Sequence, residues 1–129
     1  MARILLDTHA LLWWLSGDRH LSAKVRNGIG DPANEVFVSA ASTWEISTKI
    51  RIGKLTAPAL MGGGVTRAIA AQGFSVLAIT ADHGERAGAL PGEHRDPFDR
   101  MLIAQAQSEG MAIVSNEQVF DAYGVTRIW

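Results

Sequence analysis

The sequence predicts an α/β fold, in which residues 1–129 form a single domain built as a three-layer α/β/α sandwich on a mainly parallel central sheet. Short apolar runs alternate with helix-like segments along the whole chain, without internal repeats or a linker. Within these runs the apolar residues are continuous, which is typical of strands covered on both faces. A length of 129 residues suits one sizeable core and is too short for two.

Composition narrows the class of protein. Hydrophobic residues make up 47% of the chain and charged residues 19%, as in a compact globular protein. Apolar runs stay well below the roughly 18 residues of a membrane span, and the first residues lack a signal peptide's cleavage site, so we expect a cytoplasmic protein. The absence of cysteine excludes disulfides, thiolate zinc sites and a Cys nucleophile. Any metal must be held by oxygen or imidazole.

The first half of the chain is expected to contain two strands and three helices. The first strand ends just before Asp7, and the following helix ends near Gly17. The expected strands are 3–6 and 36–39, and the expected helices are 10–16, 22–28 and 46–50.

The second half continues the alternation after a loop over residues 55–64 that contains three consecutive glycines. The expected helices are 65–72, 80–88, 96–109 and a last helix through 120–123, and the expected strands are 74–79, 111–114 and, at the end, 126–128.

Two carboxylates lie together at the start of the central helix, residues 96–109. Asp96 is the expected N-cap, Pro97 occupies the first helical position and Asp99 the third. Capping alone could explain Asp96, and the helix dipole alone could explain Asp99. Both acids become site candidates because three others are expected at the same edge of the fold.

Asp7 and Glu117 follow the first and fourth predicted strands. The carboxyl ends of strands carry the ligands in open α/β sheets, so both are site candidates. Asp7 could instead be a plain helix cap. Thr8 could cap that helix or hold Asp7 in place, whereas His9 is more typical of a surface or capping residue than of a metal ligand.

Glu45 closes the sequence Ser42-Thr43-Trp44-Glu45, which matches a capping box that would open the helix 46–50. The capping role does not exclude metal ligation by the same carboxylate. Lys49, Arg51 and Lys54 follow within two turns. They could hold substrate phosphates, or they could form an ordinary solvated basic face.

The net charge of −1 conceals an uneven distribution. If Asp7, Glu45, Asp96, Asp99 and Glu117 form one metal-neutralised site, eight acids remain against 12 Lys and Arg. The rest of the surface is then mildly basic, which is compatible with a phosphate-backbone substrate.

The residues also resemble a known family over nearly the whole chain. The matching features are Leu5-Leu6-Asp7-Thr8 before a Leu- and Trp-rich helix, Ser42-x-x-Glu45-Ile46 with Lys49 and Gly53-Lys54-Leu55 after it, the run from His94 to Arg100 before Leu102-Ile103-Ala104, and Val114-Ser115-Asn116-Glu117 with Phe120 and Tyr123-Gly124. In their order and spacing, these motifs resemble the PIN domain and, within it, the VapC-type toxins of bacterial toxin–antitoxin pairs.

The resemblance implies a Mg²⁺- or Mn²⁺-dependent endoribonuclease. Its matching carboxylates are Asp7, Glu45, Asp99 and, at the fourth place, Glu117, and Asp96 is a usual extra acid. The family mostly has Asp at the fourth place, after a Thr-containing turn. Here Glu117 follows Ser115, which keeps the charge but extends it by one methylene.

The clustered carboxylates predict a metal site independently of the family resemblance. Close acids raise one another's pKa, and a hard divalent cation relieves their repulsion. We assign Asp7, Glu45 and Asp99 to the principal ion, with Asp96 and Glu117 orienting water or supporting a weaker second ion. Thr8 and Ser115 are expected to support these ligands. The candidates for RNA phosphate contacts are Lys49, Arg51, Lys54, Arg95 and Arg100.

The resemblance also implies RNA as substrate, a small antitoxin protein as partner, and a homodimer. Trp13 and Trp14 are adjacent on a helix and point about 100° apart, so we expect one in the core. The other is a candidate for a partly exposed anchor for a partner, with ordinary packing as the alternative.

Two other functions stay open. A magnesium-dependent phosphatase also places an Asp after its first strand, but the usual second Asp two residues later is missing here. A module that binds RNA or antitoxin, with cleavage lost through the change at Glu117, is the non-enzymatic alternative.

Overall fold

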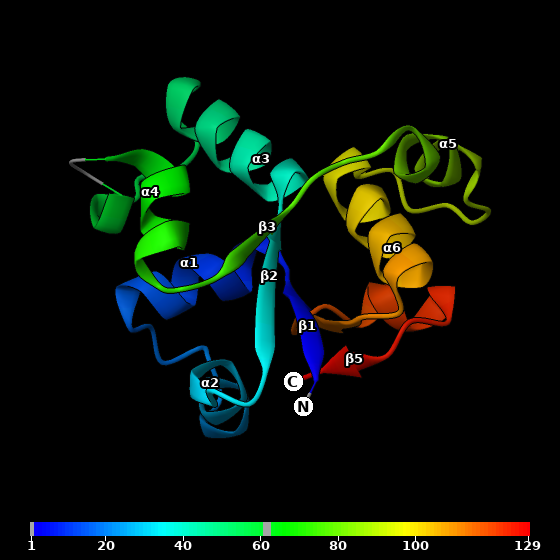
Figure 1. The fold of residues 1–129 in the computed structure, drawn as a ribbon. Helices are drawn as coiled ribbons and strands as arrows, with labels where there is room; N and C mark the ends of the chain where they lie inside the picture. Colours follow the sequence, from blue (N-terminus) through cyan, green and yellow to red (C-terminus); the bar gives the residue numbers. More distant parts are fainter. Residues whose placement is uncertain (1, 61–62) are drawn as a thin grey trace.

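A computed structural model describes residues 2–60 and 63–129 (Figure 1). Its centre is a five-stranded sheet in the order β3-β2-β1-β4-β5, and every neighbouring pair is parallel. The strands are β1 Arg3–Leu6, β2 Glu35–Ser39, β3 Ser75–Leu77, β4 Ala112–Val114 and β5 Arg127–Ile128. The predicted α/β fold with a parallel sheet is therefore confirmed.

Helices cover both faces of this sheet. Figure 1 shows α1, α2 and α4 on one side and α5 and α6 on the other, while α3 rises from the carboxyl end of β2. The α-helices are α1 Thr8–Ser16, α2 Ala23–Gly30, α3 Ala40–Arg51, α4 Gly64–Ala71, α5 Ala81–Ala89 and α6 Pro97–Glu109, and the 3₁₀ segments are η1 Pro58–Leu60 and η2 Gln118–Tyr123. None of the helices in the described part of the chain is both long and apolar enough to cross a membrane.

The central strand β1 divides its side chains between two cores. Ile4 and Leu6 belong to a cluster under α1 and α2, whereas Leu5 packs with Leu102 and Phe120 on the opposite face. This alternation follows from the period of two in a strand. Full burial of each leucine contributes about 1.5–3 kcal/mol to folding, so both layers hold β1 in place.

The register fixes where the strands end. Leu6 pairs with Val38 of β2 and with Val114 of β4, so the carboxyl ends of the three central strands meet at one edge. The residues that follow them begin α1, α3 and the turn before η2. This edge is therefore where side chains from distant parts of the sequence come together.

One helix start differs from the prediction. The helix expected at 46–50 is α3, which begins at Ala40 directly after β2, and its N-cap is Ser39, whose hydroxyl accepts a hydrogen bond from Ala41 N at 3.0 Å. The capping-box interpretation of Ser42 and Glu45 is therefore wrong. Positions three apart are also neighbours inside a helix, so the same spacing fits the body of α3.

Other differences are smaller. Helix α2 runs to Gly30, β3 is shorter than expected, and the last helix is the 3₁₀ segment η2. Helix α4 begins at Gly64, while Met61 and Gly62 of the expected loop lie outside the described residues. The predicted stop of α6 is confirmed at Gly110, whose φ of 67° suits a residue without a side chain.

Candidate functional site

Asp7 is both a helix cap and a buried acid at the end of β1. One carboxylate oxygen, Oδ1, accepts a hydrogen bond from Ala10 N at 2.8 Å, which caps α1. The residue is 3% exposed. Burial raises the pKa of Asp7 to about 6, against the lowering effects of the Ser115 side chain and the Ala10 N–H, and the charge of Glu117 raises it further. The capping interpretation is thus correct, but it leaves an acid whose negative charge is poorly balanced.

Glu45 projects from the middle of α3 and is also buried, at 5% exposure. Thr8 donates its hydroxyl to Glu45 Oε1 at 2.6 Å, and Lys49 Nζ lies 2.5 Å from Oε2. Thr8 Oγ1 also lies 3.1 Å from Ser42 Oγ. Thr8 therefore holds Glu45, rather than Asp7 as the sequence suggested.

Asp96 and Asp99 occupy the start of α6 as predicted. Asp96 is the N-cap, and its Oδ1 accepts hydrogen bonds from Phe98 N at 2.8 Å and Asp99 N at 3.2 Å. Burial raises the pKa of Asp99 to about 6, and the charges of Asp96 and Glu117 add to this effect. Like Asp7, Asp99 is a carboxyl group in an environment that disfavours its charge.

A histidine that sequence reasoning did not select lies against Asp99. His94 Nε2 is 2.8 Å from Asp99 Oδ2, and this contact lowers the pKa of Asp99 against the stronger effect of burial. The sequence places His94 near the start of α6, two residues before the N-cap and five before Asp99. The direction of its ring could only come from the fold.

Glu117 lies near both Asp7 and Asp99. Its charge raises the pKa of both Asp7 and Asp99, and its side chain is 38% exposed. Ser115 Oγ accepts a hydrogen bond from the Glu117 backbone N–H at 2.9 Å, so Ser115 contacts this part of the site. His9 Nδ1 stands 3.7 Å from Glu117 Oε1.

Lys49 is the cation closest to the acids. Its hydrogen bond to Glu45 raises the pKa of Lys49, and the charges of Glu45, Asp96 and Asp99 add to this. The ammonium group therefore balances part of the negative charge between α3 and α6. The charge of Glu117 acts on the pKa of Asp7 and Asp99, and the charges of Glu45 and Asp96 act on the pKa of Lys49. The five acids of the predicted site therefore lie near one another at one edge of the sheet.

The other basic candidates separate into two groups. Arg100 donates to the backbone carbonyls of Ala87, Leu90 and His94, so it ties the segment before α6 to the helix. Arg51, Lys54 and Arg95 are exposed. The structure thus gives Arg100 a role in packing and leaves the other three accessible.

The donors present suit a hard divalent cation in their chemistry. Carboxylate oxygens are the ligands that Mg²⁺ prefers, and burial together with the charge of Glu117 raises the pKa values of Asp7 and Asp99. Within residues 2–60 and 63–129, however, no three acid or histidine side chains converge closely enough to hold an ion. Glu45 is turned toward Thr8 and Lys49, and Asp99 toward His94.

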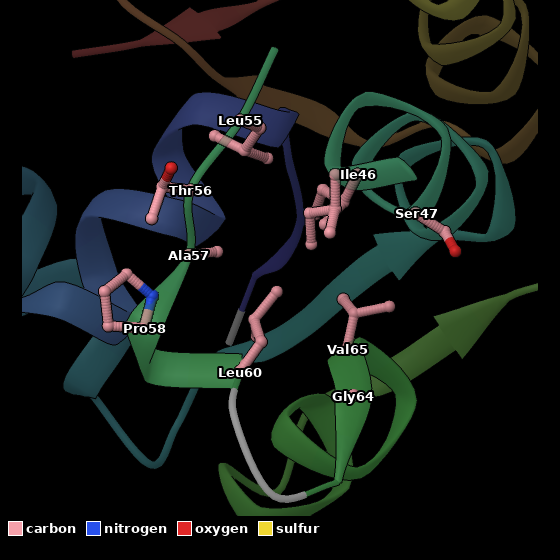
Figure 2. A pocket seen from close by; sticks show the side chains of 10 residues that line it. Ile46, Ser47, Leu55, Thr56, Ala57, Pro58, Leu60, Gly64 and Val65 are labelled. Carbon is pink, nitrogen blue, oxygen red and sulfur yellow. The ribbon is translucent and has the colours of Figure 1, made fainter. Parts of the chain in front are cut away.

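An apolar cavity of about 350 Å³ lies against α3 (Figure 2). Ile46 and Val65 point into it, and Leu55 and Leu60 close its sides. Ile50 also lines it and is 43% exposed. Ile46 and Ile50 line this cavity from α3, the helix that also carries Glu45.

Comparison with solved structures gives matches over nearly the whole chain. VapBC2 from Rickettsia felis, bound to a DNA fragment from its promoter, has a TM-score of 0.73 at 13% identity, and the match covers 98% of this chain and 97% of that one. A toxin–antitoxin complex from Klebsiella pneumoniae has a TM-score of 0.64 at 22% identity, covering 98% and 96%.

The sarcin–ricin loop cleaving toxin VapC20 from Mycobacterium tuberculosis has a TM-score of 0.59 at 20% identity, covering 97% of this chain and 98% of that one. These structures are similar to this chain in fold. No curated protein matches the sequence significantly. The family model for the PIN domain matches residues 4–125. The chain therefore belongs to the PIN-domain family.

Proposed function

We propose that this chain is a divalent-metal-dependent endoribonuclease and the toxin of a toxin–antitoxin pair. The observation that carries the proposal is that Asp7, directly after β1, and Asp99, in the first turn of α6, are both acids whose pKa values are raised to about 6, first by burial and further by the charge of Glu117. Acids with such pKa values are typical of functional sites. Solved toxins with the same fold, including one that cleaves RNA, support the choice of substrate.

Asp7, Asp99 and Glu117 are the residues that would hold the ion, although in the described part of the chain their side chains do not converge on one point. Bound Mg²⁺ or Mn²⁺ supplies charge neutralisation and lowers the pKa of a coordinated water. Glu45 would be a further ligand if its Oε2 were free of Lys49, and Thr8 would then hold its Oε1 in place. His94 orients Asp99, while Asp96 is committed to the N-cap and adds negative charge.

The reaction adds water across one P–O bond of the RNA backbone. Lys49, once released from Glu45, is a cation placed beside the acids and can contact a phosphate oxygen. Arg51, Lys54 and Arg95 are exposed cations available for neighbouring phosphates.

We assign the antitoxin to the apolar surface around the cavity in Figure 2. Ile50, which lines the cavity, is 43% exposed, and Ile52, the C-cap of α3, is 48% exposed. Exposed apolar side chains at the border of a cavity are typical of protein contacts. Ile50→Asp should weaken antitoxin binding, and full-strength binding by this variant would reject the assignment.

We also propose a homodimer that acts in the cytoplasm. Trp13 and Trp14 are both half-buried and pack against the core cluster, in keeping with the ordinary packing that the sequence left open. Trp44, at 64% exposure, is a better candidate for the contact. Light scattering should give a dimer mass, and a monomer at high concentration would contradict this part of the proposal.

A cleavage assay tests the function. The purified chain is incubated with structured RNA, and separately with a small phosphate ester, in Mg²⁺, Mn²⁺ or EDTA. We expect internal RNA cleavage with either metal and none with EDTA. Hydrolysis of the ester alone would identify a phosphatase. Intact RNA that the chain still binds would identify a binding module. The ion pair between Glu45 and Lys49 favours this alternative because it occupies a carboxylate that the metal would need.

A further inference from the structure

Three aromatic rings form a stack at the start of α1 and the loop after it. The Trp13 ring stacks with the His9 ring, with 5.5 Å between centroids and 26° between planes, and with the His20 ring at 5.0 Å and 19°. Trp129, near the end of the chain, contacts Trp13 in a tilted arrangement at 5.8 Å. His9 and Trp13 are four residues apart and share a helix face. The orientation of the His9 ring is therefore supported from behind by a large aromatic side chain.

His9 connects this stack to the acidic site. Its Nδ1 lies 3.7 Å from Glu117 Oε1, and its charge acts on the pKa of Asp7. The His9 side chain is 52% exposed, so part of the ring is open to solvent while the rest packs on Trp13. A flat aromatic surface thus borders the place where a phosphodiester would meet the acids.

We propose that His9, supported by Trp13, is a stacking ledge for an unpaired RNA base next to the scissile phosphate. The inference rests on the proposed function and narrows its substrate to RNA whose base beside the cleaved bond is unstacked. Imidazole and indole rings are common stacking partners for splayed bases, and such stacking tolerates any base because every base has a π face. Under the proposed function the scissile phosphate lies at these acids, so the group that meets a ring beside them is a base of the same RNA.

Binding of a short single-stranded oligoribonucleotide tests the ledge separately from cleavage. Fluorescence anisotropy is measured on the Asp99→Asn chain, which keeps the RNA intact, with His9→Ala, His9→Phe or His20→Ala added. His9→Ala should weaken binding about tenfold, because one stacked base is lost. His9→Phe keeps a flat ring and should retain binding. His20→Ala is the matched control, since His20 joins the same stack but pairs with Asp18 at 2.6 Å.

Abasic substitutions show whether a base is the group that stacks. One abasic position in the oligonucleotide should weaken its binding to the chain that retains His9 as much as His9→Ala does. In the His9→Ala variant the same abasic position should not weaken binding any further. Thermal melting of each variant checks that the fold is intact. A purely structural role for His9 would not produce this dependence on one base.

Two results would overturn the ledge: unchanged affinity in His9→Ala, or an abasic penalty that persists in that variant. If His9→Ala binds RNA normally but binds the cognate antitoxin more weakly, the ring is a protein contact and the ledge is rejected. Failure of the unmodified chain to cleave RNA in Mg²⁺ or Mn²⁺ rejects the proposed endoribonuclease instead, because the ledge is measured by binding.

Discussion

The hydroxyl of Thr8 and the carboxylate of Glu45 are 2.6 Å apart, although 37 residues separate them in the sequence. The bond joins the first turn of α1 to the middle of α3 and fixes one oxygen of a buried acid. Lys49 holds the other oxygen from the next turn of α3. The orientation of Glu45 is thus set by two partners on two helices.

Removing the Thr8 donor should destabilise the fold. Thr8→Val has nearly the same shape but leaves Glu45 with a hydrogen bond unmade, at a cost of about 1–3 kcal/mol in the free energy of unfolding. Thr8→Ser keeps the hydroxyl and should stay close to the original stability. Urea denaturation of the three proteins measures the difference, and equal midpoints for Thr8→Val and the original chain would contradict this role.

Asp99→Asn should abolish RNA cleavage while the chain remains folded. Asp96 rather than Asp99 caps α6, and an amide at position 99 can still contact His94. Burial raises the pKa of Asp99, which means that its negative charge is unfavourable in the folded chain. Removing that charge should therefore not lower the free energy of unfolding. Cleavage rate and thermal melting are measured together, and loss of the fold would instead assign Asp99 a structural role.

Stability should fall as the pH rises from about 4 to 6. A carboxyl whose folded pKa is raised binds its proton more tightly in the folded state, so between its ordinary pKa of 3.8 and about 6 the folded chain holds more protons than the unfolded chain. For buried Asp7 the difference between the folded and ordinary pKa corresponds to about 3 kcal/mol in the free energy of unfolding. This stability is lost progressively as the pH rises across the window, and above it the contribution of Asp7 no longer changes.

Asp7→Asn should reduce this pH dependence, because asparagine can still cap α1 but does not titrate. The free energy of unfolding measured from pH 4 to pH 8 tests the point. A variant whose profile follows that of the original chain would show that Asp7 does not carry the effect.

Added Mg²⁺ or Mn²⁺ should raise the melting temperature at pH 7 and much less near pH 4. Metal binding stabilises the folded state by mass action and requires ionised ligands, and Asp7 and Asp99 are largely protonated well below pH 6. Asp99→Asn should reduce the increase at pH 7. Ca²⁺-free buffer with EDTA provides the baseline, and a metal-independent melting temperature would argue against an ion at this site.

Arg100 and Arg95 should behave differently when each is changed to Gln. Arg100 donates to three backbone carbonyls, so Arg100→Gln should lower the free energy of unfolding by about 1–3 kcal/mol. Arg95 is exposed, so Arg95→Gln should change the free energy of unfolding by no more than about 0.5 kcal/mol and should instead weaken RNA binding. The reverse pattern in denaturation and RNA titration would reject both assignments.

The sequence alone could predict features that depend on neighbouring residues. The parallel strands, the caps at Asp7 and Asp96 and the glycine stop of α6 were all available locally, because capping and strand burial involve residues within a few positions of one another. The meeting of Asp7 and Glu117 at one edge followed from strands β1 and β4 being parallel neighbours. The family followed from the order of these motifs.

The tertiary structure decided where the side chains point. The sequence placed Glu45 at a helix start, but α3 begins five residues earlier because it continues directly from β2, and packing then turns Glu45 toward Thr8. It also decided that Lys49 faces the acids and that His9 stacks on Trp13 beside Glu117. These contacts join elements far apart in the chain, so they depend on how helices pack across the sheet, which local propensities do not encode.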